Sequence, residues 1–503
     1  MAIKRNLMKE HQEAIVLEST PTKLSMKCCK YEQGCQWRVR GHRQLDAHVI
    51  ASLVLGMIRK EPSVSISLVQ ERITHVYGFK VSYRKAWYAK QKAMAIMYGD
   101  WEESYAFLPR WCEYMLRFSP GSVYNIQTDD YFVTNRLVRD KRVFHRIFWT
   151  YKQCCEAFNF CKPVIQIDGT HLYGKYKGKL LIATAQDGNA ECLPLAFAIV
   201  EGETLEAWQY FLDNIRRHVT QKQNICLISD RHRSILSAVE SHRGWQPPHA
   251  QHVFCLRHIA SYTPSEVDFD IAFVKFRDIS PEIADWIDQI PKEKVLKGAR
   301  NMPITGLVKH TYSRLVHYFV EKGQAAAAQL HASNRHCKNI VEAMKFNESL
   351  ATGHNVRTYN VDEIVFEVDE GYERSSSVNL PQKYCQCGKF KAFKYPCSHA
   401  YAAALSVRRN AFGYVDDVFL TENLVHAYSF LWQPIGNEAA IPPSVGVVII
   451  PDRTMLRAKG RPKSTRIRNE MDEVEASQSR IKCGVCKLPG HNRHSCPNRL
   501  PNQ

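Results

Sequence analysis

The order of hydrophobic and polar positions divides the chain into a helical first part and a mixed second part. From residue 61 to 160, apolar residues recur at spacings of three and four, as in SISLVQERITHVYG and SYRKAWYAKQKAMAIMYG, which predicts amphipathic helices. The outer face of the second stretch carries four basic residues, Arg84, Lys85, Lys90 and Lys92. From this stretch alone we favour a solvated helix face, and the alternative is a face that contacts DNA.

The pattern changes between residues 163 and 240. PVIQIDGTHL predicts a buried strand, LLIATAQDGNAECLPLAFAIV a hairpin of two strands, and TLEAWQYFLDNIRRHV an amphipathic helix. A second short buried strand, NICLISD, and the helical segment RSILSAVESH follow. A long hairpin combined with a parallel crossover predicts a mixed sheet flanked by helices, so the expected fold class is multi-domain α/β.

Further along the chain the pattern is less regular. Helical text continues through 281–345, residues 360–370 and 376–384 predict short strands, and Pro, Gly and charge dominate after residue 433. There is no internal repeat. The expected domains are a Cys-rich segment (1–50), a helical DNA-binding or linker region (51–160), an α/β core (161–325), a C-terminal region with a Cys/His cluster (326–435), a basic linker (436–480) and a second Cys/His cluster (481–498).

Composition indicates a class of partner. The 503 residues contain 68 Lys and Arg against 50 Asp and Glu, a net charge of +18, which favours a polyanion because basic side chains displace counterions from phosphates. No stretch approaches the ~20 apolar residues of a membrane span, and MAIKRNLMKEHQE lacks the apolar core of a signal peptide. We therefore expect neither a secreted nor a membrane-spanning protein. In such a chain the 17 cysteines favour metal ligation where they cluster.

Two Cys/His clusters have the spacing of complete zinc sites. Cys483-x2-Cys486-x4-His491-x4-Cys496 is the pattern of a zinc knuckle, and a segment this short cannot bury a core without the metal. Cys385-x-Cys387-x9-Cys397-x-His399 takes two ligands from a strand end and two from the start of a helix, the pattern of a SWIM finger. Chance clustering is the alternative in each case. Knuckles of this type contact single-stranded nucleic acid or proteins.

Two further clusters are less complete. The segment HAQHVFCLRH contains His249, His252, Cys255 and His258, with the last two one helical turn apart. These residues either bind a structural metal or form a polar brace. At the N-terminus, Cys28, Cys29 and Cys35 have only His42 and His48 as nearby partners. That spacing leaves zinc binding by the N-terminal cysteines open.

A basic segment lies between the two complete Cys/His clusters. Seven Lys or Arg and no acid occur between Arg453 and Arg468, around the core GRPK. A Gly-Arg-Pro core resembles the AT-hook, whose extended Arg-Pro unit inserts into a narrow A·T minor groove. A nuclear-import signal or a plain solvated linker is the alternative. The residues expected to contact nucleic acid are Arg457, Lys459, Arg461, Lys463, Arg466 and Arg468.

Two acids end predicted strands. Asp168 ends the first buried strand, just before Gly169, and Asp230 ends NICLISD. Carboxylates on neighbouring strand ends can share a pair of divalent cations such as Mg²⁺ or Mn²⁺, the arrangement used for in-line phosphoryl chemistry. A strand-end Asp also commonly caps the next helix, and Asp230 precedes RHRSILSAV. Both roles are open at this point.

Taken together, these segments resemble plant Mutator-like element (MULE) transposases. The resemblance rests on IDGTHLYGKYKGKLLIATAQDGN with Asp168, LISDRHRSI with Asp230, and FCLRHIA, and on LKGARNMPITGLV, the SWIM finger, GRPK and the knuckle in family order. It implies an RNase H-like core with an Asp/Asp/Glu site that binds Mg²⁺ or Mn²⁺. It also implies an N-terminal zinc finger that helps to recognise element ends, and it includes Cys255 and His258 in the core pattern.

The chain departs from the family pattern at the third acid. The family carries this acid in a Thr-Asn-x-x-Glu-x-x-Asn segment before LKGAR, whereas here DWIDQIPKEK runs directly into VLKGARNMPIT. Glu342, in NIVEAMKFN, follows LKGAR and is expected to be a helix surface residue. Stretches are also missing after IAS (259–261) and after RVRGH. The core therefore lacks part of its helical insertion, and the N-terminal finger is truncated.

These features predict a zinc-binding, DNA-binding nuclear protein derived from a transposase and inactive because the third acid is missing. One alternative is an active transposase in which Glu240 or Glu282 supplies that acid. Another is an RNA-binding or adaptor protein that acts through its knuckle. The expected partners are duplex DNA, either A·T-rich or at element ends, single-stranded nucleic acid at the knuckle, and further copies of this chain.

Overall fold

The computed structural model describes residues 47–457, except 61, 63, 78–80, 256–298, 361–364, 372–374, 437–440 and 443–445, and the backbone of three strands before residue 47. The chain forms two units, Met1–Leu456 and Arg457–Gln503, and the second lies outside the described residues beyond Arg457. The three early strands form an antiparallel sheet of β1 (Ala14–Ser19), β2 (Leu24–Cys28) and β3 (Arg38–Arg40).

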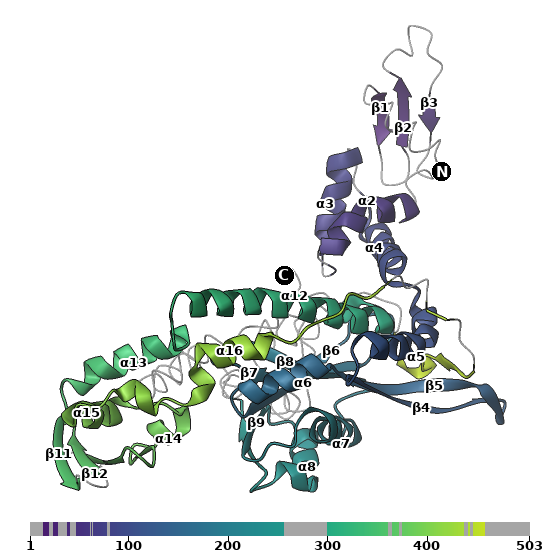
Figure 1. The fold of residues 1–503 in the computed structure, drawn as a ribbon. Helices are drawn as coiled ribbons and strands as arrows, with labels where there is room; N and C mark the ends of the chain where they lie inside the picture. The colour runs from purple at the N-terminus through teal and green to yellow at the C-terminus, as the bar shows by residue number, and fades with distance from the viewer. Residues whose placement is uncertain are drawn as a thin grey trace, which may run out of the picture. The chain divides into compact units, whose positions relative to one another are not determined.

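Four helices follow, and they confirm the helical prediction for residues 66–118. They are α2 (Ala47–Lys60), α3 (Ile66–Tyr77), α4 (Tyr83–Tyr98) and α5 (Trp101–Phe118) (Figure 1). Polar caps fix two of the helix starts. The Ser82 hydroxyl accepts a hydrogen bond from the Lys85 N–H of α4, and the Asp100 carboxylate accepts two from the first turn of α5.

The helical prediction is wrong for residues 123–150. They form a long antiparallel hairpin of β4 (Val123–Val133) and β5 (Arg136–Thr150). Thr134 and Asn135, between the strands, both have positive φ, as a tight hairpin turn requires. Charged residues interrupt the apolar alternation because much of the hairpin is exposed, and only the end of β5 is continuously buried.

The main sheet has eight strands in the order β10-β9-β6-β7-β8-β5-β15, with β4 paired to β5. β6, β7, β8 and β5 are antiparallel neighbours, whereas β9 pairs in parallel with β6, and β10 with β9. The predicted mixed sheet is confirmed, including its hairpin and both short strands. The remaining bounds are β6 (Val164–His171), β7 (Lys179–Gln186), β8 (Cys192–Val200), β9 (Ile225–Ser229), β10 (Ala250–Phe254) and β15 (Val448–Ile450).

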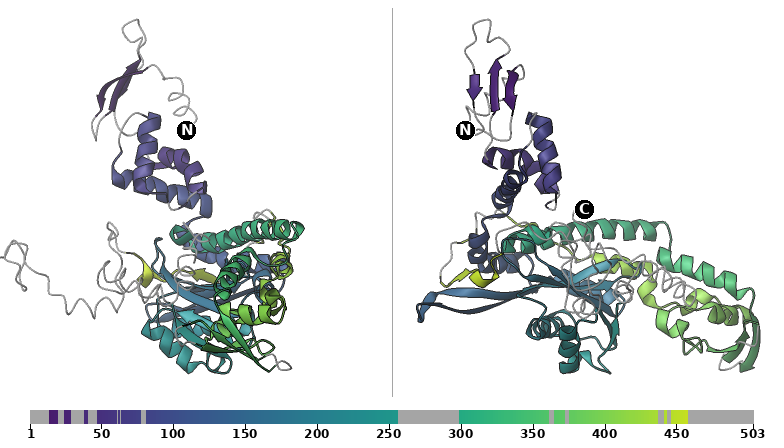
Figure 2. Two further views of the ribbon diagram at one scale, coloured as in Figure 1. Left: turned by 90° about the vertical axis from the view of Figure 1, so that its left-hand side faces the viewer. Right: turned by 180° about the vertical axis from the view of Figure 1, so that it is seen from behind.

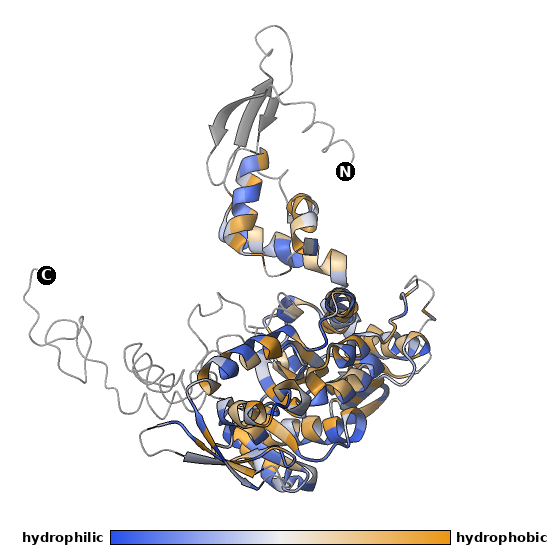
Figure 3. Ribbon diagram, turned by 60° about the vertical axis from the view of Figure 1, so that its left-hand side comes forward, coloured by the Kyte–Doolittle hydropathy of each residue, from blue (hydrophilic) through white to orange (hydrophobic). Residues whose placement is uncertain are grey.

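Helices cover both faces of this sheet (Figures 1 and 2). One face carries α6 (Lys152–Ala157), α12 (Ile304–His331) and α16 (Thr421–Tyr428), and the other carries α7 (Leu205–Asn214) and α8 (Arg233–Ser241). Hydrophobic residues gather on the strands between these layers (Figure 3). There the rings of Trp149 and Phe197 stack 5.4 Å apart, and Trp149 Nε1 donates to Thr311 Oγ1 of α12 at 3.0 Å. Among the described helices, none combines the length and apolar character of a membrane span.

A second, smaller hydrophobic core follows α12. Phe366, Val378 and Phe390 are fully buried in it, together with Cys385. A four-stranded antiparallel sheet forms one side of this core and includes the two predicted short strands. Its elements are α13 (Lys338–Ala351), β11 (Asn355–Asn360), β12 (Val365–Asp369), β13 (Ser375–Asn379), β14 (Tyr384–Cys385), α14 (Lys389–Phe393) and α15 (Ser398–Ser406).

Part of the predicted linker belongs to the main sheet. β15 pairs in parallel with β5 at Lys141–Val143, and Leu456 forms an isolated bridge with Tyr176. The prediction of a linker over 436–480 is therefore wrong for residues 448–456. A strand of three residues carries too little periodicity to be recognised locally, and its partner lies about 300 residues away in the sequence.

Candidate functional site

Two acids lie at neighbouring positions on parallel strands of the main sheet. β6 and β9 pair with Val164 opposite Cys226 and Gln166 opposite Ile228. Continuing this register by two residues places Asp168 opposite Asp230, which directly follows β9. Both acids are partly buried. The sheet thus brings together the two carboxylates that sequence analysis singled out.

Each of these carboxylates also accepts a local backbone hydrogen bond. Asp168 Oδ1 accepts from the Gly169 N–H at 2.8 Å, and Asp230 Oδ1 accepts from the His232 N–H at 2.9 Å. Because α8 begins directly after His232, Asp230 stabilises the turn into this helix. A carboxylate has lone pairs beyond the one used here, so this structural role is compatible with cation binding.

Within the described residues, no third Asp, Glu, His or Cys forms a metal-binding group with this pair. Glu203, which sequence analysis did not single out, lies close by: a Cβ at Gly169 would be 2.5 Å from Glu203 Oε1. However, neighbouring residues of a strand point to opposite faces, so Glu203 lies on the side of β6 opposite the Asp168 side chain. There it forms an ion pair with Lys179 at 3.0 Å.

The other acids considered as a third metal ligand beside Asp168 and Asp230 lie elsewhere in the chain. Glu342 is exposed on α13 and forms an ion pair with Lys338 at 3.8 Å, which confirms the prediction that it is a helix surface residue. Glu240 is exposed on α8. Glu282 lies outside the described residues.

Strand β10 supports the strand end that carries Asp230. His252 Nε2 lies 2.8 Å from Ser229 Oγ, and the Cys255 N–H donates to the Ser229 carbonyl at 2.7 Å. Burial lowers the pKa of His252, which favours the neutral ring. These contacts show that the segment braces the strand end, whereas the metal role predicted for Cys255 and His258 stays a prediction because His258 lies outside the described residues.

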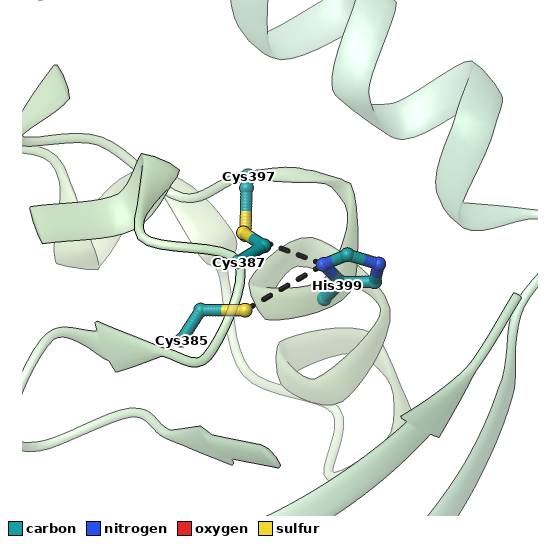
Figure 4. A group of neighbouring side chains, drawn as sticks. All are labelled: Cys385, Cys387, Cys397 and His399. Atoms are coloured by element: carbon teal, nitrogen blue, oxygen red, sulfur yellow. Dashed lines mark hydrogen bonds between the residues drawn. The ribbon is translucent and has the colours of Figure 1, made fainter. Parts of the chain in front are cut away.

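The residues Cys385, Cys387, Cys397 and His399 form a compact four-ligand cluster (Figure 4). Cys385 ends β14, and His399 lies in the first turn of α15, which Cys397 precedes. The four ligand atoms all lie within 4.8 Å of one another. Cys387 Sγ and Cys397 Sγ are 3.6 Å apart, and His399 Nδ1 is 3.5 Å from Cys385 Sγ. Sulfur atoms held tetrahedrally at ~2.3 Å from Zn²⁺ are separated by ~3.8 Å, so these residues fit the ion.

The crowding of the thiols also favours a cation. Contacts with Cys385 and Cys397 hold the pKa of Cys387 well below the usual value for a thiol, whereas contacts with Cys385 and Cys387 raise the pKa of Cys397. Zinc binds thiolates and displaces their protons, so a divalent ion would stabilise all three sulfurs in one state.

A carboxylate lies behind the histidine of this cluster. Glu370, directly after β12, contacts His399 Nε2 through Oε1, while His399 Nδ1 faces the sulfurs. His354 stacks on the same ring with centroids 5.1 Å apart. A carboxylate bound to the outer nitrogen of a ligating histidine fixes the orientation of the ring. Sequence analysis missed Glu370 because it lies 29 residues before His399, outside the ligand motif.

The remaining predicted sites fall outside the described residues. These are the knuckle ligands Cys483, Cys486, His491 and Cys496, the basic residues after Arg457, and the N-terminal cysteines, of which only the backbone of Cys28 is described.

The fold and its cluster define an α/β protein with a separate Cys₃His metal centre of the zinc type. Residues 164–262 match the MULE transposase domain, and residues 373–408 match the SWIM zinc finger. The chain therefore carries a MULE transposase domain, which contains both strand-end acids, and a SWIM zinc finger, which contains all four ligands. The predicted resemblance is confirmed for these two domains. No curated protein matches the chain.

Proposed function

We propose that this chain is a DNA-binding, zinc-containing protein derived from a MULE transposase, and that it does not cleave DNA. The observation that carries the second part is the pair Asp168 and Asp230, which no third ligand group accompanies within the described residues. Such a pair lacks part of the charge that holds two divalent cations. Loss of one electrostatic group at an active site typically lowers the rate by ~10²–10³.

An RNase H-like assignment of the core is supported by its topology. Strands β6, β7 and β8 form an antiparallel meander, and β9 and β10 add in parallel on the other side of β6. Counted from β6, Asp168 lies on the first strand of this core, and Asp230 directly follows the fourth strand, β9. Mg²⁺ or Mn²⁺ would bind between them, because hard cations prefer carboxylate oxygens.

DNA binding is supported by charge. The net charge of +18 and the seven Lys and Arg from Arg453 to Arg468 favour binding to phosphates, and the SWIM zinc finger and the predicted knuckle would add contacts to nucleic acid. A chain that acts on chromosomal DNA would work in the nucleus.

The test is a pair of assays on the full chain. Binding to a duplex of about 30 base pairs, roughly three helical turns, should weaken steeply between about 50 and about 200 mM salt. Affinity that does not change over this range would contradict DNA binding. Incubation with Mn²⁺ should produce no nicks in a supercoiled plasmid. Nicking that disappears in Asp168→Ala would instead establish an active site that uses Asp168 and is completed by another acid.

Zinc is tested separately by metal analysis of the purified chain. Cys385→Ala should remove about one zinc per chain, because a tetrahedral site with three ligands left binds the ion poorly. Asp168→Ala should leave the zinc content unchanged. Equal zinc in wild type and Cys385→Ala would contradict a metal role for the cluster.

A further inference from the structure

Helices α2, α3 and α4 form a small bundle in which α4 buries one face. Ala86, Ala89, Ala93 and Met94 are fully buried on that face, and the small side chains allow the backbone of α4 to approach α2 closely. Lys90, predicted on the outer face, is buried instead, and its Nζ donates to the Val64 carbonyl at 2.6 Å. The bundle therefore fixes the rotation of α4 about its own axis.

The opposite face of α4 combines aromatic and basic side chains. Tyr83, Trp87 and Tyr88 are 47%, 37% and 48% exposed, although residues of this size are usually more deeply buried. The rings of Trp87 and Tyr88 meet edge to face at 5.1 Å, and the Arg84 guanidinium lies 5.6 Å from the Tyr88 ring. Lys92 is exposed two turns further along the helix.

The charge of this face indicates the chemistry of the partner that binds it. α4 contains four basic residues and no acid, so no carboxylate on the helix neutralises Arg84 or Lys92. A face that served solubility alone would carry polar residues in place of three large rings. A second protein would also suit aromatic rings, but positive charge that no carboxylate of α4 neutralises favours a phosphate backbone.

The architecture matches the same partner. α4 follows α3 after a short connection and packs against α2, so its outer face is presented by two supporting helices. A helix with side chains is ~10–12 Å wide, and the major groove of B-DNA is ~12 Å wide. In helix-turn-helix proteins, the N-terminal turns of the second helix contact base edges, and here these turns carry Arg84, Trp87 and Tyr88.

We propose that α4 is a recognition helix that enters the major groove of duplex DNA. Arg84 and Lys92 bind phosphate or base edges, and Trp87 and Tyr88 pack against bases and sugars. This inference deepens the proposed DNA binding and rests on it. It assigns the contact to a site that is independent of the zinc clusters and of the basic segment after Arg453.

The experiment measures binding of the full chain to a fluorescent duplex of about 30 base pairs at several salt concentrations. The double variant Arg84→Ala/Lys92→Ala should bind about tenfold or more weakly and lower the slope of log affinity against log salt by about 2, because each phosphate contact contributes about 1. Trp87→Ala should weaken binding with little change in slope. Arg72→Ala, a loss of exposed positive charge on the neighbouring helix α3, should have a smaller effect on binding than either of the two α4 variants.

The outcomes separate this inference from the proposed function. Wild-type affinity and slope in Arg84→Ala/Lys92→Ala would overturn the recognition helix while leaving DNA binding intact. No duplex binding by the wild type would overturn both. Loss of self-association in Trp87→Ala, with unchanged DNA binding, would assign the face to a second copy of the chain. Circular dichroism should match the wild type in all variants, and thermal unfolding should match it in the Arg and Lys variants, whose altered side chains are exposed.

Discussion

The contact between Glu370 and His399 predicts how tightly the SWIM centre holds zinc. Glu370→Ala removes the carboxylate that fixes the His399 ring, while leaving all four ligands in place. Loss of such an outer partner typically weakens metal affinity by 10–100-fold, or ~1.4–2.7 kcal/mol. We expect the lower end, about tenfold, because the Glu370 side chain is 38% exposed and water can replace part of the contact.

The assay is competition between the full chain and a chromophoric zinc chelator at neutral pH. Cys483→Ala/Cys486→Ala serves as the background, so that the predicted knuckle does not contribute to the signal. Glu367→Ala is the matched control. It removes a glutamate of β12 that accepts hydrogen bonds from Tyr359 and Ser375 and does not contact the cluster. Equal zinc affinity for Glu370→Ala and Glu367→Ala would refute the reasoning.

Two further predictions concern buried polar groups that join distant parts of the chain. Burial raises the pKa of Asp187 to about 6, against an ordinary value of 3.8. The protonated carboxyl therefore contributes to stability fully below about pH 4, and this contribution is lost, by up to ~3 kcal/mol, as pH rises through 6. Asp187→Asn keeps an acceptor for the turn and a partner for Tyr428, and the amide does not ionise. The unfolding midpoint of the variant should therefore rise relative to that of the wild type from pH 4.5 to pH 7. A constant difference between the two midpoints would contradict this prediction. Thr311→Val removes the acceptor of the buried Trp149 N–H and a partner of the Tyr151 hydroxyl, and should lower the free energy of unfolding by about 1–3 kcal/mol, whereas Thr311→Ser should restore it.

The strands and ligands that the sequence predicted correctly share one property, which is that their signal is local. β8 and β9 are buried between helix layers and contain few polar positions, and β6 and β7 keep buried apolar residues at alternate positions. The four ligands of the SWIM finger lie within fifteen residues, so their spacing alone indicates a closed site. Neither feature depends on which distant segment packs against it.

The features that the sequence predicted wrongly depend on contacts with other segments of the chain. β4 and β5 carry charges on both sides because their hairpin is largely exposed, so the alternation that marks a strand is absent. β15 has only three residues and forms by pairing in parallel with β5. Lys90 lies on a helix with exposed basic residues before and after it, and its hydrogen bond to the carbonyl of Val64, 26 residues earlier, is not visible in the pattern of the helix.

The sequence by itself thus determined the candidate acids, the zinc ligands and the charge of the chain, because these depend on residue type and on spacing within a few turns. Only the tertiary structure decided that parallel pairing of β6 and β9 sets Asp168 opposite Asp230, and that Glu203 lies on the other face. It also decided that Glu370 supports His399 and that the aromatic face of α4 is turned outward. The physical reason is that register and burial are set by contacts between segments far apart in the chain, which local periodicity does not record.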